Sequence, residues 1–329
     1  MSRAILLLLA WAVCAAGAEQ VLLVVLKASS AVAYYSLDGK LLATVKVGLH
    51  PHEIALSPDR KFAYVTDNGT MRSEDPGQGG NAISIIDIAA RKRVGTISTG
   101  KYRRVHGISV DPRTGYLGVT AEAPNRVLHI DTKGRDIIRH FDTKGHTSHM
   151  VILPPGQSGA EYAFVSNAGM ATVSTIHLTS GLVKSIPTGD RPEGMALSKD
   201  GKELFVCNRE SASITVIDVA RQGAIGAIKT GQGPVRIATV PDGSMLVYAL
   251  MHDNKIEFAD TALRRPVAQV PVDGSPVSIA LSPDGQLAFA AAEEKDTVFV
   301  ISVPDRKLLR SFQTAKGSAP DSIALATLP

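Results

Sequence analysis

The chain has 329 residues, of which 44% are hydrophobic, and a formal net charge of +4. This length and apolar content are sufficient for a large buried core. The charge is small and spread along the chain, without a run of five lysines or arginines, so binding to nucleic acid is not predicted.

The first eighteen residues have the pattern of a secretory signal peptide. Arg3 provides the positive start, residues 4–13 the apolar stretch, and residues 16–18 a small-residue cleavage site. The apolar stretch is too short for a stable helix across a bilayer. The alternative is a lipoprotein anchored through Cys14, but the valine before this cysteine is unfavourable for lipidation. We therefore expect a secreted or periplasmic protein, cleaved after Ala18, with no transmembrane segment in the mature chain.

One repeated strand–turn–strand motif organises the mature chain. In its clearest copy, residues 51–67, two alternating apolar runs flank a Ser-Pro-Asp-Arg turn, which indicates a β-hairpin. Further copies begin at Val105, Ser148, Pro192, Pro234, Pro276 and Pro320. From His52 to Asp321, the second residues of the copies are 54, 43, 44, 42, 42 and 44 residues apart. Such a regular period indicates a repeat protein.

Each hairpin is followed by two more apolar runs, such as residues 83–87 and 93–97 in the first copy. Four short strands in about forty residues are typical of one β-propeller blade. Strands alternating with helices would require long helical periodicity, and the sequence has none.

The two ends of the chain complete one further blade. Residues 21–47 contain only the later runs of a blade, and residues 320–326 supply the missing first strand. Pairing them would close the ring and remove exposed sheet edges. We predict an all-β fold, a seven-bladed propeller of four-stranded antiparallel blades. It would form one domain over residues 19–329 and be a monomer.

The first copy also carries an insertion, residues 69–80, which is polar and rich in glycine. It is predicted to be a loop between the second and third strands of its blade. Loops of this length in a compact repeat are either disordered or functional, and both alternatives stay open here.

The repeats resemble those of the bacterial YVTN-repeat propellers. The closest matches are Tyr64-Val-Thr-Asp67, Phe205-Val-Cys-Asn208, Ser282-Pro-Asp-Gly285 and Ser213-Ile-Thr-Val-Ile-Asp218. The resemblance covers essentially the whole mature chain and implies the propeller fold. It does not imply one activity, because such a scaffold hosts enzymes and binding proteins alike. In this motif Cys207 replaces a threonine and is predicted to be a small buried residue rather than a nucleophile.

A narrower similarity links the chain to propeller lactonases. His50-Pro-His52 and His149-Met150 match segments of that family, whereas Asp67-Asn-Gly69 and Ser148 differ from it. This resemblance implies lactone hydrolysis or a related lyase reaction.

The residues that start each first strand are the candidate site. The first strand of every propeller blade is innermost, so these residues are expected to surround one mouth of the central channel. They are His52, His106, His149, Glu193, Arg236, Ser278 and Asp321. Hairpin pairing brings the ends of the second strands beside them, which adds Asp67, Asn167 and Asn208 as candidate ligand-binding residues. The same pairing brings His106 toward Thr120 and Glu122.

Three interpretations of this ring are open. The polar side chains could only satisfy neighbouring strand ends. They could bind a small anionic or carbonyl ligand, with Arg236 holding a carboxylate and His52, His106, His149 and Glu193 as catalytic acids and bases. The third interpretation is a divalent metal held by His52, His106 and His149. A non-catalytic scaffold that binds a protein partner outside the channel is the contrasting function.

Overall fold

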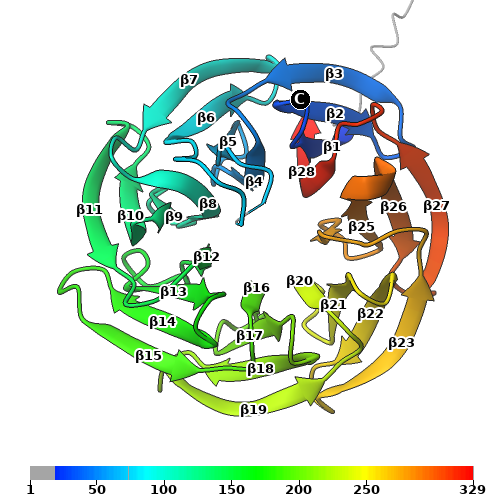
Figure 1. Ribbon diagram of the computed structural model, residues 1–329. Helices are drawn as coiled ribbons and strands as arrows, with labels where there is room; N and C mark the ends of the chain where they lie inside the picture. The colour runs from blue at the N-terminus through cyan, green and yellow to red at the C-terminus, as the bar shows by residue number, and fades with distance from the viewer. Residues whose placement is uncertain (1–18, 73, 329) are drawn as a thin grey trace, which may run out of the picture.

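The computed structural model describes residues 19–72 and 74–328, and these form a ring of seven four-stranded antiparallel sheets (Figure 1). The predicted all-β, seven-bladed propeller is therefore confirmed. The predicted signal peptide, residues 1–18, lies outside the described residues.

The innermost strands are β28 (Pro320–Leu328), β4 (Pro51–Leu56), β8 (Arg103–Val110), β12 (Ser148–Ile152), β16 (Pro192–Leu197), β20 (Pro234–Thr239) and β24 (Ala280–Leu281). The second strands are β1 (Glu19–Leu26), β5 (Phe62–Asp67), β9 (Leu117–Ala123), β13 (Tyr162–Asn167), β17 (Glu203–Asn208), β21 (Met245–Leu250) and β25 (Leu287–Ala292). The third strands are β2 (Ala31–Ser36), β6 (Ala82–Asp87), β10 (Asn125–Asp131), β14 (Thr172–His177), β18 (Ser213–Asp218), β22 (Lys255–Asp260) and β26 (Thr297–Ser302).

The outer strands are β3 (Leu41–Lys46), β7 (Lys92–Ser98), β11 (Asp136–Asp142), β15 (Val183–Pro187), β19 (Gly223–Lys229), β23 (Arg265–Pro271) and β27 (Lys307–Gln313). A short 3₁₀ turn, η1 (Glu293–Lys295), follows β25. Among the described residues, no helix is long and apolar enough to cross a membrane.

The ring closes as predicted, because β28 pairs with β1 from Glu19↔Leu328 to Leu26↔Pro320. The first and last parts of the chain thus share one blade, β28-β1-β2-β3. With this pairing the first blade has the same four strands as the others, and the edge of its second strand β1 is covered by β28.

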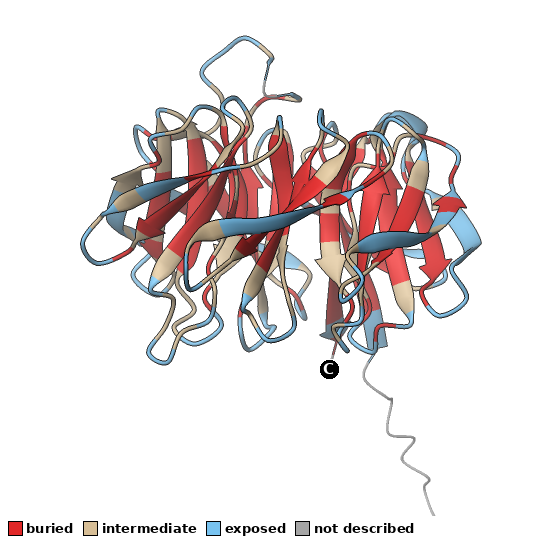
Figure 2. Cartoon of the chain, turned by 90° about the horizontal axis from the view of Figure 1, so that it is seen from below, coloured by how far each residue is buried: buried red, intermediate tan, exposed pale blue. Residues whose placement is uncertain are grey.

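Burial follows the position of a strand within its blade. The second and third strands are buried almost throughout, whereas outer strands such as β27 face solvent (Figure 2). Fully buried aromatic side chains, among them Phe164, Phe205 and Phe289, fill the space between neighbouring sheets. The hydrophobic core is therefore a ring of inter-blade layers around a polar centre.

The Ser-Pro-Asp-Arg turn of the first copy is held by its own side chains. Ser57 Oγ donates to the Asp59 carboxylate (2.6 Å), and the amides of Lys61 and Phe62 donate to Asp59 and Ser57. The pairs Ser198–Asp200 and Ser282–Asp284 repeat the arrangement. These contacts explain why the motif recurs at each such hairpin.

Candidate functional site

A register shift at the start of the inner strands turns the ring residues toward the channel. In β4 the pairing with β5 breaks between Pro51 and Ile54, which leaves His52 and Glu53 outside the regular ladder. The same break occurs in β8, β12, β16 and β20. Such bulges reorient side chains and increase the local twist. This is the local reason why polar residues at these positions face the axis instead of a sheet.

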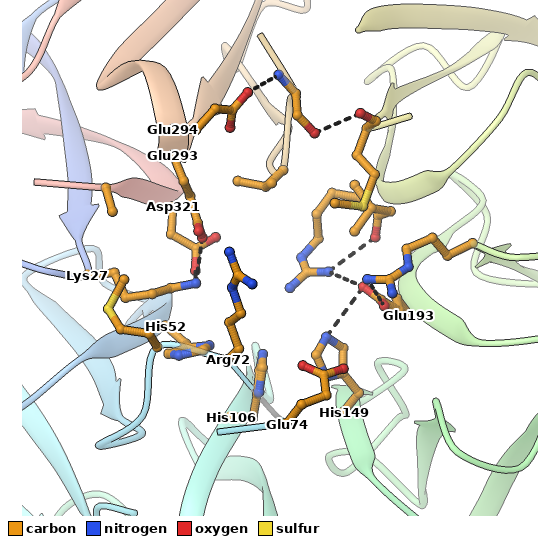
Figure 3. Close-up of a pocket in the computed structure, with 18 of the residues that line it drawn as sticks. Lys27, His52, Arg72, Glu74, His106, His149, Glu193, Glu293, Glu294 and Asp321 are labelled. Carbon is orange, nitrogen blue, oxygen red and sulfur yellow. Dashed lines mark hydrogen bonds and ion pairs between the residues drawn. The ribbon is translucent and has the colours of Figure 1, made fainter. Parts of the chain in front are cut away.

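The channel opens into a cavity of about 650 Å³ (Figure 3). Six of the seven predicted ring residues line it: His52, His106, His149, Glu193, Arg236 and Asp321. Ser278 does not line the cavity, because its hydroxyl accepts a hydrogen bond from the Ala291 amide and is buried. Val235 and Val277 contribute an apolar part of the wall.

The structure places Asp67, Asn167 and Asn208 away from the cavity, which corrects their expected role as ligand-binding residues. Their side chains are buried within the blades, where Asp67 accepts from the Gly48 amide and the Ser84 hydroxyl. Asn167 and Asn208 donate to hydroxyls of their third strands.

The residues that continue from the second strands toward the channel lie one position after Asp67, Asn167, Asn208 and their counterparts in the other repeats. By the strand pairing, this position holds Lys27, Asn68, Glu122, Ala168, Arg209, Met251 and Glu293. Four of them, Lys27, Arg209, Met251 and Glu293, line the cavity. Successive residues of a strand point to opposite faces, so a one-residue shift separates the two sets. Hairpin pairing already indicates Glu122 beside His106, and aligning the repeats at this position would have found the others.

The inserted loop, residues 69–80, lies over the channel. Its Met71, Arg72 and Glu74 line the cavity, and the Glu74 carboxylate pairs with Arg191 (2.6 Å) across the mouth. The guanidinium of Arg104 donates to Thr70 Oγ1 and to the carbonyl oxygens of Arg72 and Asp75. Of the two alternatives for this insertion, these contacts favour an ordered segment that belongs to the site.

Glu193 is the centre of an ion-pair network. Its carboxylate lies 3.0 Å from Arg191 Nε, 3.0 Å from Arg209 Nη1 and 3.6 Å from both Arg236 Nη1 and His149 Nε2. Burial alone would raise its pKa, but His149 and the arginines outweigh burial and lower the pKa to about 2. Glu193 therefore stays ionised at neutral pH and is unsuited to donate a proton, contrary to the acid role considered above.

Arg236 is engaged by protein groups, which differs from its expected role as a carboxylate clamp. Its Nη2 and Nε donate to Glu53 Oε1 (2.6 and 3.2 Å), and its Nη1 donates to the Val235 carbonyl (3.2 Å). A further buried ion pair lies opposite, where Lys27 Nζ is 2.9 Å from Asp321 Oδ2 and also contacts Glu293. Burial opposes the charge on Lys27, but these two carboxylates raise its pKa.

Arg72 differs from the other cationic side chains that line the cavity. Lys27, Arg191, Arg209 and Arg236 each pair with carboxylates. Among the described residues the Arg72 guanidinium makes no hydrogen bond or ion pair, and Figure 3 shows it pointing into the middle of the cavity. It is a positive charge available to a ligand.

The three ring histidines pack against one another, His52 and His106 edge to face and His106 and His149 at a tilt. The ring centroids of His52 and His106 are 4.5 Å apart, and those of His106 and His149 are 3.9 Å apart. Their ring nitrogens have different partners. His52 Nε2 lies 2.8 Å from the Thr70 carbonyl oxygen, whereas the Nδ1 atoms of His106 and His149 face the Glu122 carboxylate. The group that meets metal-ligand spacing is thus His106, Glu122 and His149, not the predicted set with His52. Burial lowers the pKa of both His52 and His149.

His146, close in sequence to His149, is exposed and does not line the cavity. Cys207 is buried, and burial raises the pKa of its thiol, in agreement with a packing role.

Fold and site together define a seven-bladed propeller with a charged, ligand-sized cavity on its axis. Residues 156–244 match the model of the YNCE-like beta-propeller family. This match and the seven blades are consistent with a propeller of the YVTN type and confirm the resemblance of the repeats. No curated protein matches the chain significantly.

Similar solved structures are also propeller proteins. A functionally unknown protein from Desulfotomaculum acetoxidans aligns with a TM-score of 0.78 and 15% identity, over 94% of this chain and 99% of that one. Hydrazine synthase from Kuenenia stuttgartiensis aligns with a TM-score of 0.71 and 20% identity, over 84% of this chain and 90% of that one. The dihydro-heme d1 dehydrogenase NirN, in complex with DHE, aligns with a TM-score of 0.65 and 14% identity, over 90% of this chain and 64% of that one. At these identities the similarity shows a shared fold and no more.

Proposed function

We propose that this propeller binds a small anionic ligand in the axial cavity, under the loop of residues 69–80. The observation that carries the proposal is the Arg72 guanidinium, which points into a cavity of about 650 Å³ without a carboxylate partner among the described residues. This volume lies within the range of small-molecule sites, roughly 300–1,000 Å³. A guanidinium binds a carboxylate through paired, charge-assisted hydrogen bonds.

The surrounding ion pairs favour a rigid pocket. Arg191, Arg209 and Arg236 are held by Glu193 and Glu53, so they shape the wall and keep their geometry when a ligand enters. Polar groups fixed before binding lose little conformational entropy on binding. Because Glu193 stays ionised, the arrangement supports binding rather than acid catalysis of a lactonase or lyase type by this residue.

Isothermal titration with succinate and citrate, against the neutral diamide of succinate, tests the proposal. We expect the anions to bind and Arg72→Ala to weaken them by about 10–100-fold, as for loss of a hydrogen bond to a charged group. Arg72→Lys should retain part of the affinity, because it keeps the charge but not the planar geometry. Arg221→Ala, on the exposed outer rim, is the matched control and should bind like the wild type. Equal affinity of wild type and Arg72→Ala, or no anion binding at all, would contradict the proposal.

We also propose that the protein acts outside the cytoplasm. The signal-peptide pattern of residues 1–18 supports this. Intact-mass analysis of the protein from the periplasm or medium should give a chain that starts at Glu19. A full-length chain found only in the cytoplasm would rule out export, and a lipid on Cys14 would show the lipoprotein alternative instead.

A further inference from the structure

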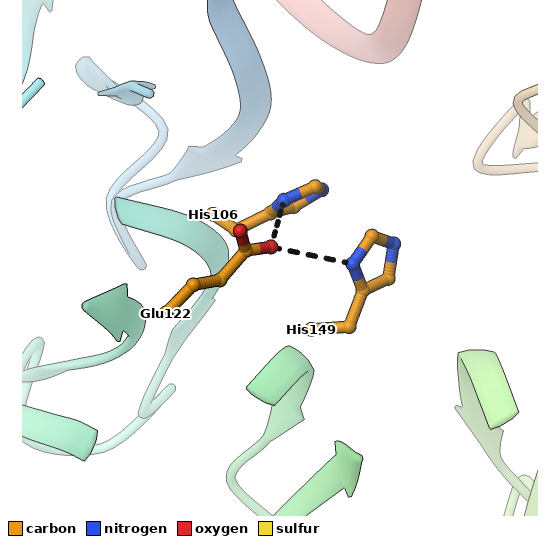
Figure 4. A group of neighbouring side chains, drawn as sticks. All are labelled: His106, Glu122 and His149. Carbon is orange, nitrogen blue, oxygen red and sulfur yellow. Dashed lines mark hydrogen bonds and ion pairs between the residues drawn. The ribbon is translucent and has the colours of Figure 1, made fainter. Parts of the chain in front are cut away.

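Three potential metal ligands from two adjacent blades converge on one wall of the cavity (Figure 4). Glu122 Oε1 lies 3.0 Å from His106 Nδ1 and 3.7 Å from His149 Nδ1. His106 and Glu122 belong to the β8–β9 hairpin, and His149 comes from β12 of the next blade. The ligand atoms of the three residues all lie within 4.8 Å of one another.

These separations suit a common metal ion. Metal–nitrogen and metal–oxygen bonds at such sites are about 2.0–2.2 Å long, so neighbouring ligand atoms are separated by about 3.0–3.5 Å. Of the two distances from Glu122 Oε1, 3.0 Å lies at the lower limit of this range and 3.7 Å is slightly above it. A small rotation of the His149 side chain is sufficient to bring its Nδ1 within this range of Glu122 Oε1.

His149 Nδ1 provides a second, independent observation. This nitrogen is buried and has no hydrogen-bond partner, and its residue is only 7% exposed. A buried polar atom without a partner costs free energy and calls for an explanation such as a bound ion.

Outer partners hold two of the ligands in place. His149 Nε2 lies 3.6 Å from Glu193 Oε2, and the second oxygen of Glu122 lies 3.4 Å from Arg104 Nε. Metal-binding histidines usually contact a carboxylate through their other nitrogen, and ligating carboxylates are themselves hydrogen-bonded. Both features are present here before any ion is considered.

We propose that His106, Glu122 and His149 bind one divalent first-row transition metal ion. Two imidazoles and a carboxylate are a donor set of zinc and iron sites that retain open coordination positions. Both histidines line the cavity into which Arg72 points, so an ion held by them would be within reach of a ligand in that cavity. The ligands do not include Arg72, so this site and the anion site can fail independently.

Titration of tag-free, chelator-treated protein with Zn²⁺ and Co²⁺ tests the metal site. Calorimetry and elemental analysis should give one ion per chain, and Co²⁺ should produce visible absorption bands. Glu122→Gln and His149→Gln should each weaken binding by more than the roughly 10–100-fold that loss of an outer partner costs. Glu122→Gln is nearly isosteric, and circular dichroism with thermal unfolding would show that each variant is folded.

Two histidine variants provide the controls. His52→Ala should retain the ion, because His52 Nε2 contacts the Thr70 carbonyl and lies outside the cluster. The exposed His146→Ala should also retain it. The inference is overturned if no stoichiometric ion binds, or if folded Glu122→Gln and His149→Gln bind as tightly as the wild type. Loss of the ion in His52→Ala or His146→Ala, as complete as in Glu122→Gln, would equally refute this ligand set.

Discussion

Asp67 occupies a position at which two other blades have asparagine. Asn167 and Asn208 end the equivalent strands, and each donates from Nδ2 to a hydroxyl of the neighbouring third strand. Asp67 instead accepts from Ser84 Oγ and from the Gly48 amide. Burial raises the pKa of Asp67 to about 6 despite these hydrogen bonds. A buried carboxylate here thus replaces a neutral amide at a purely structural position.

Asp67→Asn is expected to stabilise the protein at neutral pH. The unfolded carboxyl titrates near its ordinary pKa of about 3.9, below the raised folded value. The wild type therefore loses stability as pH rises from about 4 to about 6, and the loss persists above. Asparagine does not ionise, so the variant should be about 1–3 kcal/mol more stable than the wild type at pH 7 and similar to it at pH 4.

Urea unfolding of both proteins from pH 4 to pH 7.5 measures this difference. Asp190→Asn, at an exposed position, is the control and should show no such pH-dependent gain. If Asp67→Asn is less stable than the wild type at pH 7, the carboxylate is needed and the argument from burial is wrong.

At the scale of the strand, one hydroxyl in each of three blades ties that blade to the next. Thr66, Thr120 and Ser166 are the penultimate aligned residues of their second strands. Their hydroxyls donate to the carbonyls of His106, His149 and Glu193, at 2.7, 2.7 and 2.8 Å. The acceptors are the ring residues of the following blade. This hydrogen bond gives a structural reason for the hydroxyl in the Tyr-Val-Thr-Asp motif. Cys207, at the equivalent position of its blade, has a thiol instead of a hydroxyl.

Close backbone approach accompanies these bonds. A Cβ atom added to Gly107 would lie 2.5 Å from the His149 carbonyl oxygen, and one on Gly194 would lie 2.5 Å from that of Val235. Glycine after the ring residue therefore allows adjacent inner strands to pack tightly. The Thr120 hydroxyl and Gly107 both meet the His149 carbonyl oxygen, so together they fix how closely β12 lies to β8.

Thr120→Val should destabilise the propeller by about 1–3 kcal/mol, because the isosteric change removes the hydroxyl and leaves a buried carbonyl without this donor. Denaturant unfolding gives the free-energy difference. Thr179→Val, at an exposed position, provides the comparison and is expected to stay within about 0.5 kcal/mol of the wild type. Equal effects of the two substitutions would show that the inter-blade hydrogen bond contributes little.

At the scale of the whole molecule, ring closure makes the cavity. Lys27 follows β1 and Asp321 lies near the start of β28, so their ion pair joins residues that are almost three hundred positions apart. The same closure brings Glu53 of the second blade within reach of Arg236. Arg236 Nη2 donates to Glu53 Oε1 at 2.6 Å. The electrostatic state of the pocket is therefore a property of the closed ring and not of any one blade.

The sequence by itself determined the period, the four strands of each blade, the closing pair of ends and most of the inner ring. These features depend on apolar alternation and turn residues within about forty positions, and such local patterns are visible in a single chain. His52, His106, His149 and Glu193 were identified at this level.

Only the tertiary structure decided how those side chains are used. The bulges in the inner strands and the one-residue change of face placed Lys27 and Arg209 at the cavity, and directed Asp67 into its blade. The tertiary structure also places the loop of residues 69–80 over the channel and pairs Arg236 with Glu53. It leaves Arg72 with no partner among the described residues. The physical reason is that these contacts cross between blades. Their distances depend on ring closure and strand twist, which the repeat pattern does not contain.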